Sequence, residues 1–182
     1  MTTSKQPTQS LTTFLRGVPV FGGLEGRSLE HLIDLLEEKV FAPGETIFFE
    51  GELGRTMYVL REGEVEVARK ATNGHSTPIV RLGPGETFGE MTLVELQPRS
   101  ATVTVTQRAR TYSLNNMDLY HLYRDDNYAY VIILQNICRM LSRRLRKADS
   151  RIVEFLATPG AKRRSAAASK SKSGSAARAR RR

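Results

Sequence analysis

The chain has 182 residues and a formal net charge of +9, from 28 Lys and Arg against 19 Asp and Glu. Nine of the basic residues and none of the acidic ones lie in residues 158–182, so residues 1–157 carry equal numbers of both signs. This distribution excludes a folded body with a generally basic surface. A chain of this length buries one sizeable core, and a second well-packed domain does not fit.

The start of the chain and its single cysteine indicate a location. Residues 1–10 are polar and lack the apolar core of a signal peptide, and no run approaches the roughly 18 apolar residues that span a bilayer. Cys138 is the only cysteine, so no disulfide can form within the chain, which suggests a reducing compartment. We therefore expect a disordered leader over residues 1–10 and a cytoplasmic protein.

Residues 11–39 have a helical pattern that Gly and Pro residues interrupt between positions 17 and 23. Ser28 is the expected N-cap of a helix that continues to Lys39. Core-facing residues recur at helical spacing in that helix, namely Leu29, Leu32, Ile33 and Leu36.

Between Val40 and Asn115 the pattern changes to short strands separated by glycine-rich turns. The expected strands are Thr46–Phe49, Thr56–Arg61, Glu64–Arg69, Pro78–Leu82, Ala101–Thr106 and Arg110–Leu114. Strands of this number and spacing favour a closed or nearly closed antiparallel barrel or jelly roll.

After Asn116 the helical period returns, with a short helix over Met117–Arg124 and a long one over about residues 125–157. The long helix carries a heptad seam of alternating three- and four-residue steps, formed by Val131, Leu134, Cys138, Leu141, Leu145, Ala148, Ile152 and Phe155. Such a seam predicts a self-associating helix pair, and the alternative is packing on the protein's own barrel.

The expected fold class is therefore α+β: an antiparallel β jelly-roll barrel flanked by N-terminal helices and one long C-terminal helix. The expected domain spans residues 11–157. Residues 158–182 contain no aromatic or branched aliphatic residue, so we expect a disordered basic tail.

The segment from Gly83 to Val105 carries the residues of an anion site. Backbone N–H groups over Gly89–Thr92 can point at phosphate oxygens, and Arg99 can add a forked, charge-assisted contact. Ser100 supplies a hydroxyl donor, and the Glu90 carboxylate suits a sugar hydroxyl. A Glu and an Arg at this separation also occur as a simple surface ion pair, so the residues alone leave both interpretations open.

This stretch resembles the phosphate-binding cassette of cyclic nucleotide-binding domains, with Phe88-Gly89-Glu90 followed by Pro98-Arg99-Ser100-Ala101-Thr102-Val103. The segment from Ile47 to Val67 is similar to the family's strand–glycine–strand pattern, and Leu15–Phe21 to its N-terminal helix. The resemblance covers about residues 11–156. It implies an eight-stranded jelly roll flanked by helices.

The resemblance also implies a role for each site residue. Arg99 and Ser100 would hold the cyclic phosphate, and Glu90 the ribose 2′-hydroxyl. Close backbone contacts would come from the cassette residues Gly89, Met91 and Thr92, and apolar walls around the base from Val67 and Ile79. The long helix would cap the pocket and pair across a homodimer, as in the catabolite activator branch.

Two departures from that branch limit what can be carried over. The branch reads adenine with two hydroxyl residues on the long helix, and the matching positions are Ala148 and Asp149, so the choice between cAMP and cGMP stays open. The residues after Ala157 are too few and too simple for a helix-turn-helix domain, so sequence-specific transcription control by this chain alone is not expected.

Metal-dependent catalysis is not expected, although cupin-type metalloenzymes share the jelly roll. His31, His75 and His121 fall in separate elements, with no pair at ligand spacing. Cys138 lies on the heptad seam, where packing is the expected role. The sequence thus predicts neither an enzyme nor a bound metal or cofactor, and cAMP or cGMP would act as a regulatory ligand.

The basic tail predicts a polyanionic partner. Its charges are Lys162, Arg163, Arg164, Lys170, Lys172, Arg178, Arg180, Arg181 and Arg182. Clusters of this kind neutralise nucleic-acid phosphates without reading sequence, and an anionic membrane, an acidic protein or no fixed partner are the alternatives.

The leading prediction is a non-enzymatic cyclic nucleotide sensor that dimerises through its C-terminal helix and carries a tail for nucleic acid or another polyanion. One alternative is a nucleoid-associated, DNA-binding architectural protein that uses the jelly roll as a dimerisation scaffold. A sensor of a cyclic dinucleotide is the other.

Overall fold

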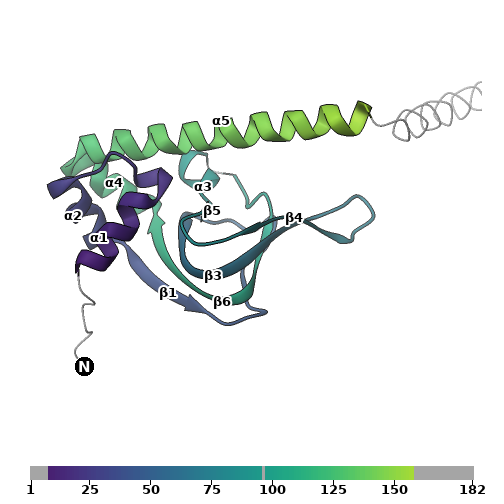
Figure 1. Cartoon of the computed structure of the whole chain (residues 1–182), viewed down its shortest axis with the longest axis horizontal. Helices are drawn as coiled ribbons and strands as arrows, with labels where there is room; N and C mark the ends of the chain where they lie inside the picture. The colour runs from purple at the N-terminus through teal and green to yellow at the C-terminus, as the bar shows by residue number, and fades with distance from the viewer. Residues whose placement is uncertain (1–7, 96, 158–182) are drawn as a thin grey trace, which may run out of the picture. The chain divides into compact units, whose positions relative to one another are not determined.

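A computed structural model describes residues 8–95 and 97–157, in which six strands form one antiparallel sheet with helices beside it (Figure 1). The strands are β1 (Glu37–Phe41), β2 (Thr46–Phe48), β3 (Thr56–Lys70), β4 (Ser76–Leu82), β5 (Thr87–Phe88) and β6 (Thr102–Asn115). The helices are α1 (Thr8–Gly17), the single 3-10 turn η1 (Pro19–Phe21), α2 (Gly26–Leu35), α3 (Met91–Val94), α4 (Asn116–Asp125) and α5 (Asn127–Ala157).

The two long central strands, β3 and β6, organise the sheet. The order is β1-β6-β3-β4, with β2 added to β6 and β5 added to β3, and every pairing is antiparallel. In the first part of β6, alternate residues enter the core, so the pattern read from Ala101 to Thr106 is that of a half-buried strand. The barrel core is Phe48, Tyr58, Leu60, Val65, Leu82, Phe88, Val103, Val105 and Ala109. The predicted α+β fold with an antiparallel jelly-roll core is confirmed.

Two pairs of expected strands are single strands in the structure. The turn expected at Gly63 is instead a set of register shifts within β3, and β6 likewise continues from Thr102 to Asn115. A Cβ at Gly63 would lie 2.7 Å from the carbonyl carbon of Arg108, so glycine allows the two strands to approach there without a break. The described chain therefore has six strands where the resemblance implied eight.

The N-terminal helices also differ from the expectation. The N-cap of α2 is Glu25, not Ser28, and the helix ends at Leu35. The residues from Glu37 to Lys39, expected to be helical, belong to β1, because their backbone pairs with β6. Helix α1 begins at Thr8, three residues inside the predicted leader.

The chain divides into two compact units, residues 1–138 and 139–182. In the first unit, α5 starts as part of the folded body: Ile133 and Ile137 are fully buried, and Asn136 Nδ2 donates to the carbonyls of Val20 (3.2 Å) and Gly22 (2.8 Å). The seam residues Val131 and Cys138 are exposed on the same stretch. The face that packs within the first unit is therefore not the heptad seam.

The second unit is described from Arg139 to Ala157, the later turns of α5. The predicted basic tail lies outside the described residues. Within residues 8–95 and 97–157, no helix is both long and apolar enough to cross a membrane.

Candidate functional site

Arg99 is held in place by its own backbone, in the loop that precedes β6. Its N–H donates to the carbonyl of Glu52 (2.8 Å), and the N–H of Gly51 donates to the Arg99 carbonyl (2.9 Å). These two hydrogen bonds hold the residues that precede β6 against the loop between β2 and β3. The Arg99 side chain points into the protein, and the residue is only 6% exposed.

The Arg99 guanidinium lies between the cassette backbone and an aromatic cluster. Nη1 donates to the Gly89 carbonyl (3.1 Å) and to Thr92 Oγ1 (3.2 Å), and Cζ lies 4.0 Å from the centroid of the Phe48 ring. Phe48 in turn packs against Tyr58 and Phe88. The aromatic core of the barrel thus forms the platform that orients the arginine.

One donor of this buried cation is unused. Arg99 Nε has no hydrogen-bond partner within the described part of the chain. A buried N–H without an acceptor is costly, and guanidinium groups bind phosphate and carboxylate oxygens through forked pairs of donors. The geometry therefore suits a small anion beside Arg99.

The electrostatic balance around Arg99 is mixed. Burial lowers the pKa of Arg99 from its ordinary value, while Tyr58, Glu52 and Glu90 act in the opposite direction. Glu90 is itself only 3% exposed. The site thus combines a buried cation with an adjacent buried carboxylate, as a ligand with both a phosphate and a hydroxyl would require.

The structure brings the two halves of the predicted motif together. Gly89, with φ +75°, turns the chain from β5 into α3, and the Gly89 carbonyl accepts from both Arg99 Nη1 and Thr92 Oγ1. On the other side of α3, Ser100 Oγ lies 3.6 Å from Met91 Sδ. Residues 89–92 and 99–100 therefore form one cluster, and the roles assigned to each remain predictions.

The predicted base contacts are only partly assembled. Val67 packs on the edge of the barrel core, and the sheet register places Val80 directly opposite it. Ile79 is the extra residue of a bulge, is not paired, and is half exposed. The spacing of apolar residues contains no signal for that bulge, and the base contacts of Val67 and Ile79 stay predictions. Ala148 and Asp149 are exposed residues of the second unit, and their part in the site stays a prediction.

Sequence reasoning also missed two residues that shape the space around Arg99, namely Phe48 and Gly54. A Cβ at Gly54 would lie 2.6 Å from Arg99 Cζ, and one at Gly89 would lie 2.6 Å from Nη1. Both glycines are therefore required by the close approach of the guanidinium. Gly54 and Phe48 did not stand out in the sequence, because each contact joins residues that are far apart along the chain.

We expect Gly54→Ala to weaken binding of an anionic ligand at Arg99 by about tenfold or more, because the added methyl group forces the guanidinium out of its position. Calorimetric titration measures the effect. Gly83→Ala is the matched control, since no atom lies within 4 Å of its added Cβ. Equal affinities of the two variants would contradict the assigned arginine position.

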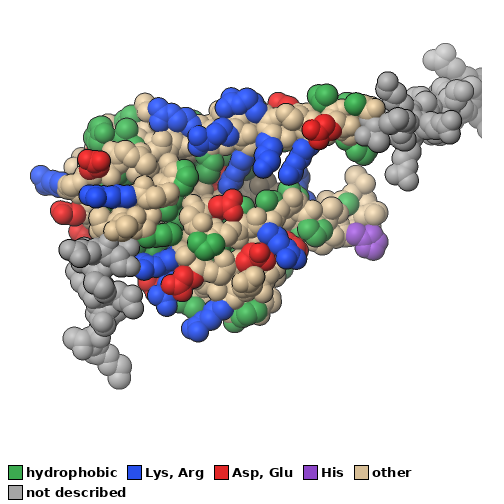
Figure 2. All heavy atoms as spheres, in the orientation of Figure 1, with side chains coloured by type: hydrophobic (Ala, Val, Ile, Leu, Met, Phe, Trp, Pro, Cys, Tyr) green, Lys and Arg blue, Asp and Glu red, His purple; other side chains and the backbone are tan. Residues whose placement is uncertain are grey.

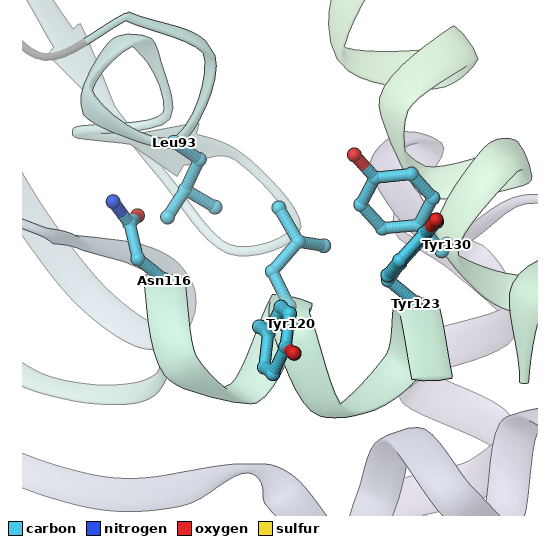
Figure 3. Close-up of a pocket in the computed structure, with 6 residues that line it drawn as sticks. Leu93, Asn116, Tyr120, Tyr123 and Tyr130 are labelled. Carbon is cyan, nitrogen blue, oxygen red and sulfur yellow. The ribbon is translucent and has the colours of Figure 1, made fainter. Parts of the chain in front are cut away.

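A cleft of about 280 Å³ lies beside α3 (Figure 3). It is lined by Leu93 of α3, by Asn116, Leu119, Tyr120 and Tyr123 of α4, and by Tyr130 of α5. The rings of Tyr123 and Tyr130 pack edge to face, with their centroids 5.2 Å apart. Helix α3 therefore takes part in the Arg99 cluster through Met91 and Thr92 and borders this cleft through Leu93.

A jelly roll that presents a buried arginine beside a short helix is suited to binding a small anionic ligand. Among residues 8–95 and 97–157, no cluster of His, Cys, Asp and Glu could hold a metal ion. Residues 38–126 match the family model of the cyclic nucleotide-binding domain, so this part of the chain belongs to that family. The matched residues include the whole Arg99 cluster.

Relatives with known structures or functions agree with this assignment. The cyclic AMP receptor protein of Thermus thermophilus is 30% identical over 139 residues, which are 74% of this chain and 61% of that protein. The cAMP-dependent protein kinase regulatory subunit of Yarrowia lipolytica is 36% identical over 101 residues, which are 56% of this chain and 26% of the relative. Both relatives are regulatory proteins.

Among solved structures, the Thermus thermophilus catabolite activator protein superposes with a TM-score of 0.67 at 29% identity, over 75% of this chain and 63% of that one. The chain thus spans about three fifths of the Thermus protein. The predicted family is confirmed for the matched residues.

Proposed function

We propose that the protein is a non-enzymatic, cytoplasmic sensor of a cyclic nucleotide, cAMP or cGMP. The observation that carries the proposal is the buried Arg99, whose Nε–H has no acceptor among the described residues and which lies within the matched cyclic nucleotide-binding domain. A cyclic phosphate supplies the missing acceptor oxygens and the compensating negative charge.

The remaining polar groups suit the rest of such a ligand. Ser100 Oγ donates to a phosphate oxygen, and the Glu90 carboxylate accepts from the ribose 2′-hydroxyl. The base lies against Val67 and the adjoining Ile79–Val80 bulge, where apolar side chains are half exposed and gain from being covered. Regulation then follows from a change of position, and no bond in the ligand is broken.

Ligand binding is transmitted through α3 in this proposal. The phosphate competes with the Gly89 carbonyl and Thr92 for the guanidinium donors, so binding releases contacts that hold the start of α3. The cleft behind Leu93 accommodates the resulting shift and connects it to α4 and the first turns of α5. Only a ligand that favours one helix arrangement shifts the equilibrium in this way.

Calorimetric titration of the whole chain with cAMP and with cGMP tests the proposal. Binding of at least one of them at micromolar concentration is expected, and the ratio of the two affinities gives the base preference. If neither binds at that level, the sensor function is wrong.

We further propose that α5 pairs with a second copy of the chain along its heptad seam. In the second unit the seam residues Leu145, Ile152 and Phe155 are all more than half exposed, and apolar side chains at this regular spacing are stable when covered by a partner helix.

We expect Leu145→Glu combined with Ile152→Glu to raise the dimer dissociation constant by about 100-fold or more, because two carboxylates would replace buried apolar contacts. Analytical ultracentrifugation measures the change. The control is Ser142→Glu combined with Ser150→Glu, which adds the same charge to exposed positions off the seam. If the dimer persists in the Leu145/Ile152 variant and is lost in the Ser142/Ser150 variant, the interface lies elsewhere.

The second candidate function, a nucleoid-associated architectural protein, is favoured by the charge of the tail. In that case the jelly roll would act as a dimerisation scaffold, and DNA binding would be indifferent to cyclic nucleotide. Duplex binding measured with and without saturating ligand separates the two functions. A sensor whose tail is coupled to the pocket changes its DNA affinity, and an architectural protein does not.

A further inference from the structure

Residues 1–157 have no net charge, but their two parts carry net charges of opposite sign. Residues 1–138, the first compact unit, contain 17 acidic and 13 basic residues, whereas residues 139–157 contain two acidic and six basic ones. Lys and Arg side chains accordingly gather along α5 (Figure 2). The boundary of the basic region therefore lies near Arg139, well before the tail at residue 158.

The cations of the later part of α5 share one face of the helix. At about 100° per residue, Arg139, Arg143, Arg144, Arg146, Lys147 and Arg151 fall within an arc of about 160°. The seam residues from Leu141 to Phe155 occupy a separate arc of about 80°, whose centre lies about 140° away. Of the two acidic residues, only Glu154 lies within the basic arc. We call this surface, formed by the six cations, the basic face of α5.

We infer that the basic face of α5 is a nucleic-acid contact surface that binds the sugar–phosphate backbone. The face is continuous in sequence with the basic tail, so residues 139–182 carry 15 basic and two acidic residues. The inference extends the proposed role of the tail to a folded element and does not depend on nucleotide binding. Its partner is a polyanion because the six cations of the face attract phosphate groups, whereas the first unit, with its net negative charge, does not.

The chemistry of the helix favours nucleic acid over a lipid surface. An amphipathic helix on a membrane buries its apolar face in the lipid, and that face here is the heptad seam, which the proposed helix pair already uses. When the seams of two helices meet, their basic faces point outward and stay accessible. The basic residues from Arg139 to Arg151 span about 18 Å along the helix, over which a duplex presents about ten phosphates.

The test measures binding of the full chain to a mixed-sequence DNA duplex of about 20 bp over a range of salt concentrations. In the test variant, Arg143→Gln, Arg146→Gln and Lys147→Gln remove three cations from the basic face, and glutamine preserves helix propensity. In the control variant, Arg16→Gln, Arg27→Gln and Arg108→Gln remove the same charge from exposed positions of the first unit. Circular dichroism verifies that helix content is equal.

The slope of log K against log[salt] is expected to decrease in magnitude by about 2.7 in the test variant, which is about 0.9 for each phosphate that is no longer neutralised. The control variant keeps the parent slope. The inference is overturned if both variants reduce the slope equally, or if the test variant retains the parent slope, since the tail would then act alone.

The remaining outcomes concern the partner. If the parent chain does not bind the duplex, the proposed nucleic-acid role of the tail fails together with this inference. Flotation with phosphatidylserine vesicles completes the test. If the test variant binds vesicles more weakly than the parent but binds the duplex equally well, the basic face is a membrane surface and the inference is overturned.

Discussion

Arg99→Lys is expected to reduce affinity for the cyclic nucleotide by about 100-fold, measured by calorimetry on the full chain. Two charge-assisted hydrogen bonds of about 1.5–3 kcal/mol each depend on the forked geometry of the guanidinium. Lysine keeps the positive charge but offers a single point donor, so it cannot satisfy two phosphate oxygens at once. Lysine also has no planar group to stack on the Phe48 ring.

The comparison with a lysine at an exposed site isolates this effect. Arg108→Lys makes the same exchange on the surface of β6, where we expect no change in nucleotide affinity. Thermal unfolding of both variants separates weaker ligand binding from a destabilised fold. An Arg99→Lys protein that is folded and binds as tightly as the parent would exclude the arginine as the phosphate ligand.

Deletion of residues 158–182 is expected to weaken duplex DNA binding by about 1000-fold at low salt, because it takes the formal net charge of the chain from +9 to zero. If about six tail charges engage phosphates, binding by the full chain falls by a similar factor between 50 and 200 mM salt. Filter binding or fluorescence anisotropy over a salt series measures both quantities. Nucleotide affinity is expected to stay the same.

A chain with the tail replaced by a Gly/Ser segment of equal length is the control for this deletion. It should behave like the truncated protein, because the charge and not the length of the tail carries the binding. Residual duplex binding that disappears when the basic face of α5 is neutralised would assign the remainder to that helix. A change in nucleotide affinity on deletion would show that tail and pocket are coupled.

Local sequence predicted which residues lie around Arg99 better than it predicted the boundaries of the elements near them. The segment from Phe88 to Val103 contains the turn glycine, the carboxylate and the arginine in order, so the cluster could be proposed before the fold was known. The segment at Glu37–Lys39 shows the opposite case. Its helical spacing continues that of α2, yet it pairs with β6, because cross-strand hydrogen bonds outweigh a weak local propensity.

The alternation of apolar and polar residues also did not predict the bends and bulges inside the long strands. Gly63 is a normal turn signal, and only the approach of β3 to the Arg108 backbone shows that the chain continues through it. Because of the bulge at Ile79, the residue that lies opposite Val67 is Val80 and not Ile79. Both features depend on the register between strands, which the alternation of one strand does not contain.

The sequence alone determined the fold class, the segment that resembles a phosphate-binding cassette, the heptad spacing and the concentration of basic residues near the end of the chain. Each of these is a property of residues a few positions apart, or of composition. The tertiary structure decided what surrounds Arg99: the Phe48 platform, the Gly54 gap and the Nε donor without an acceptor among the described residues. Gly54 and Arg99 are 45 positions apart in the chain. The pairing of β2 with β6 and the backbone hydrogen bonds that join Arg99 to Gly51 and Glu52 bring them into contact.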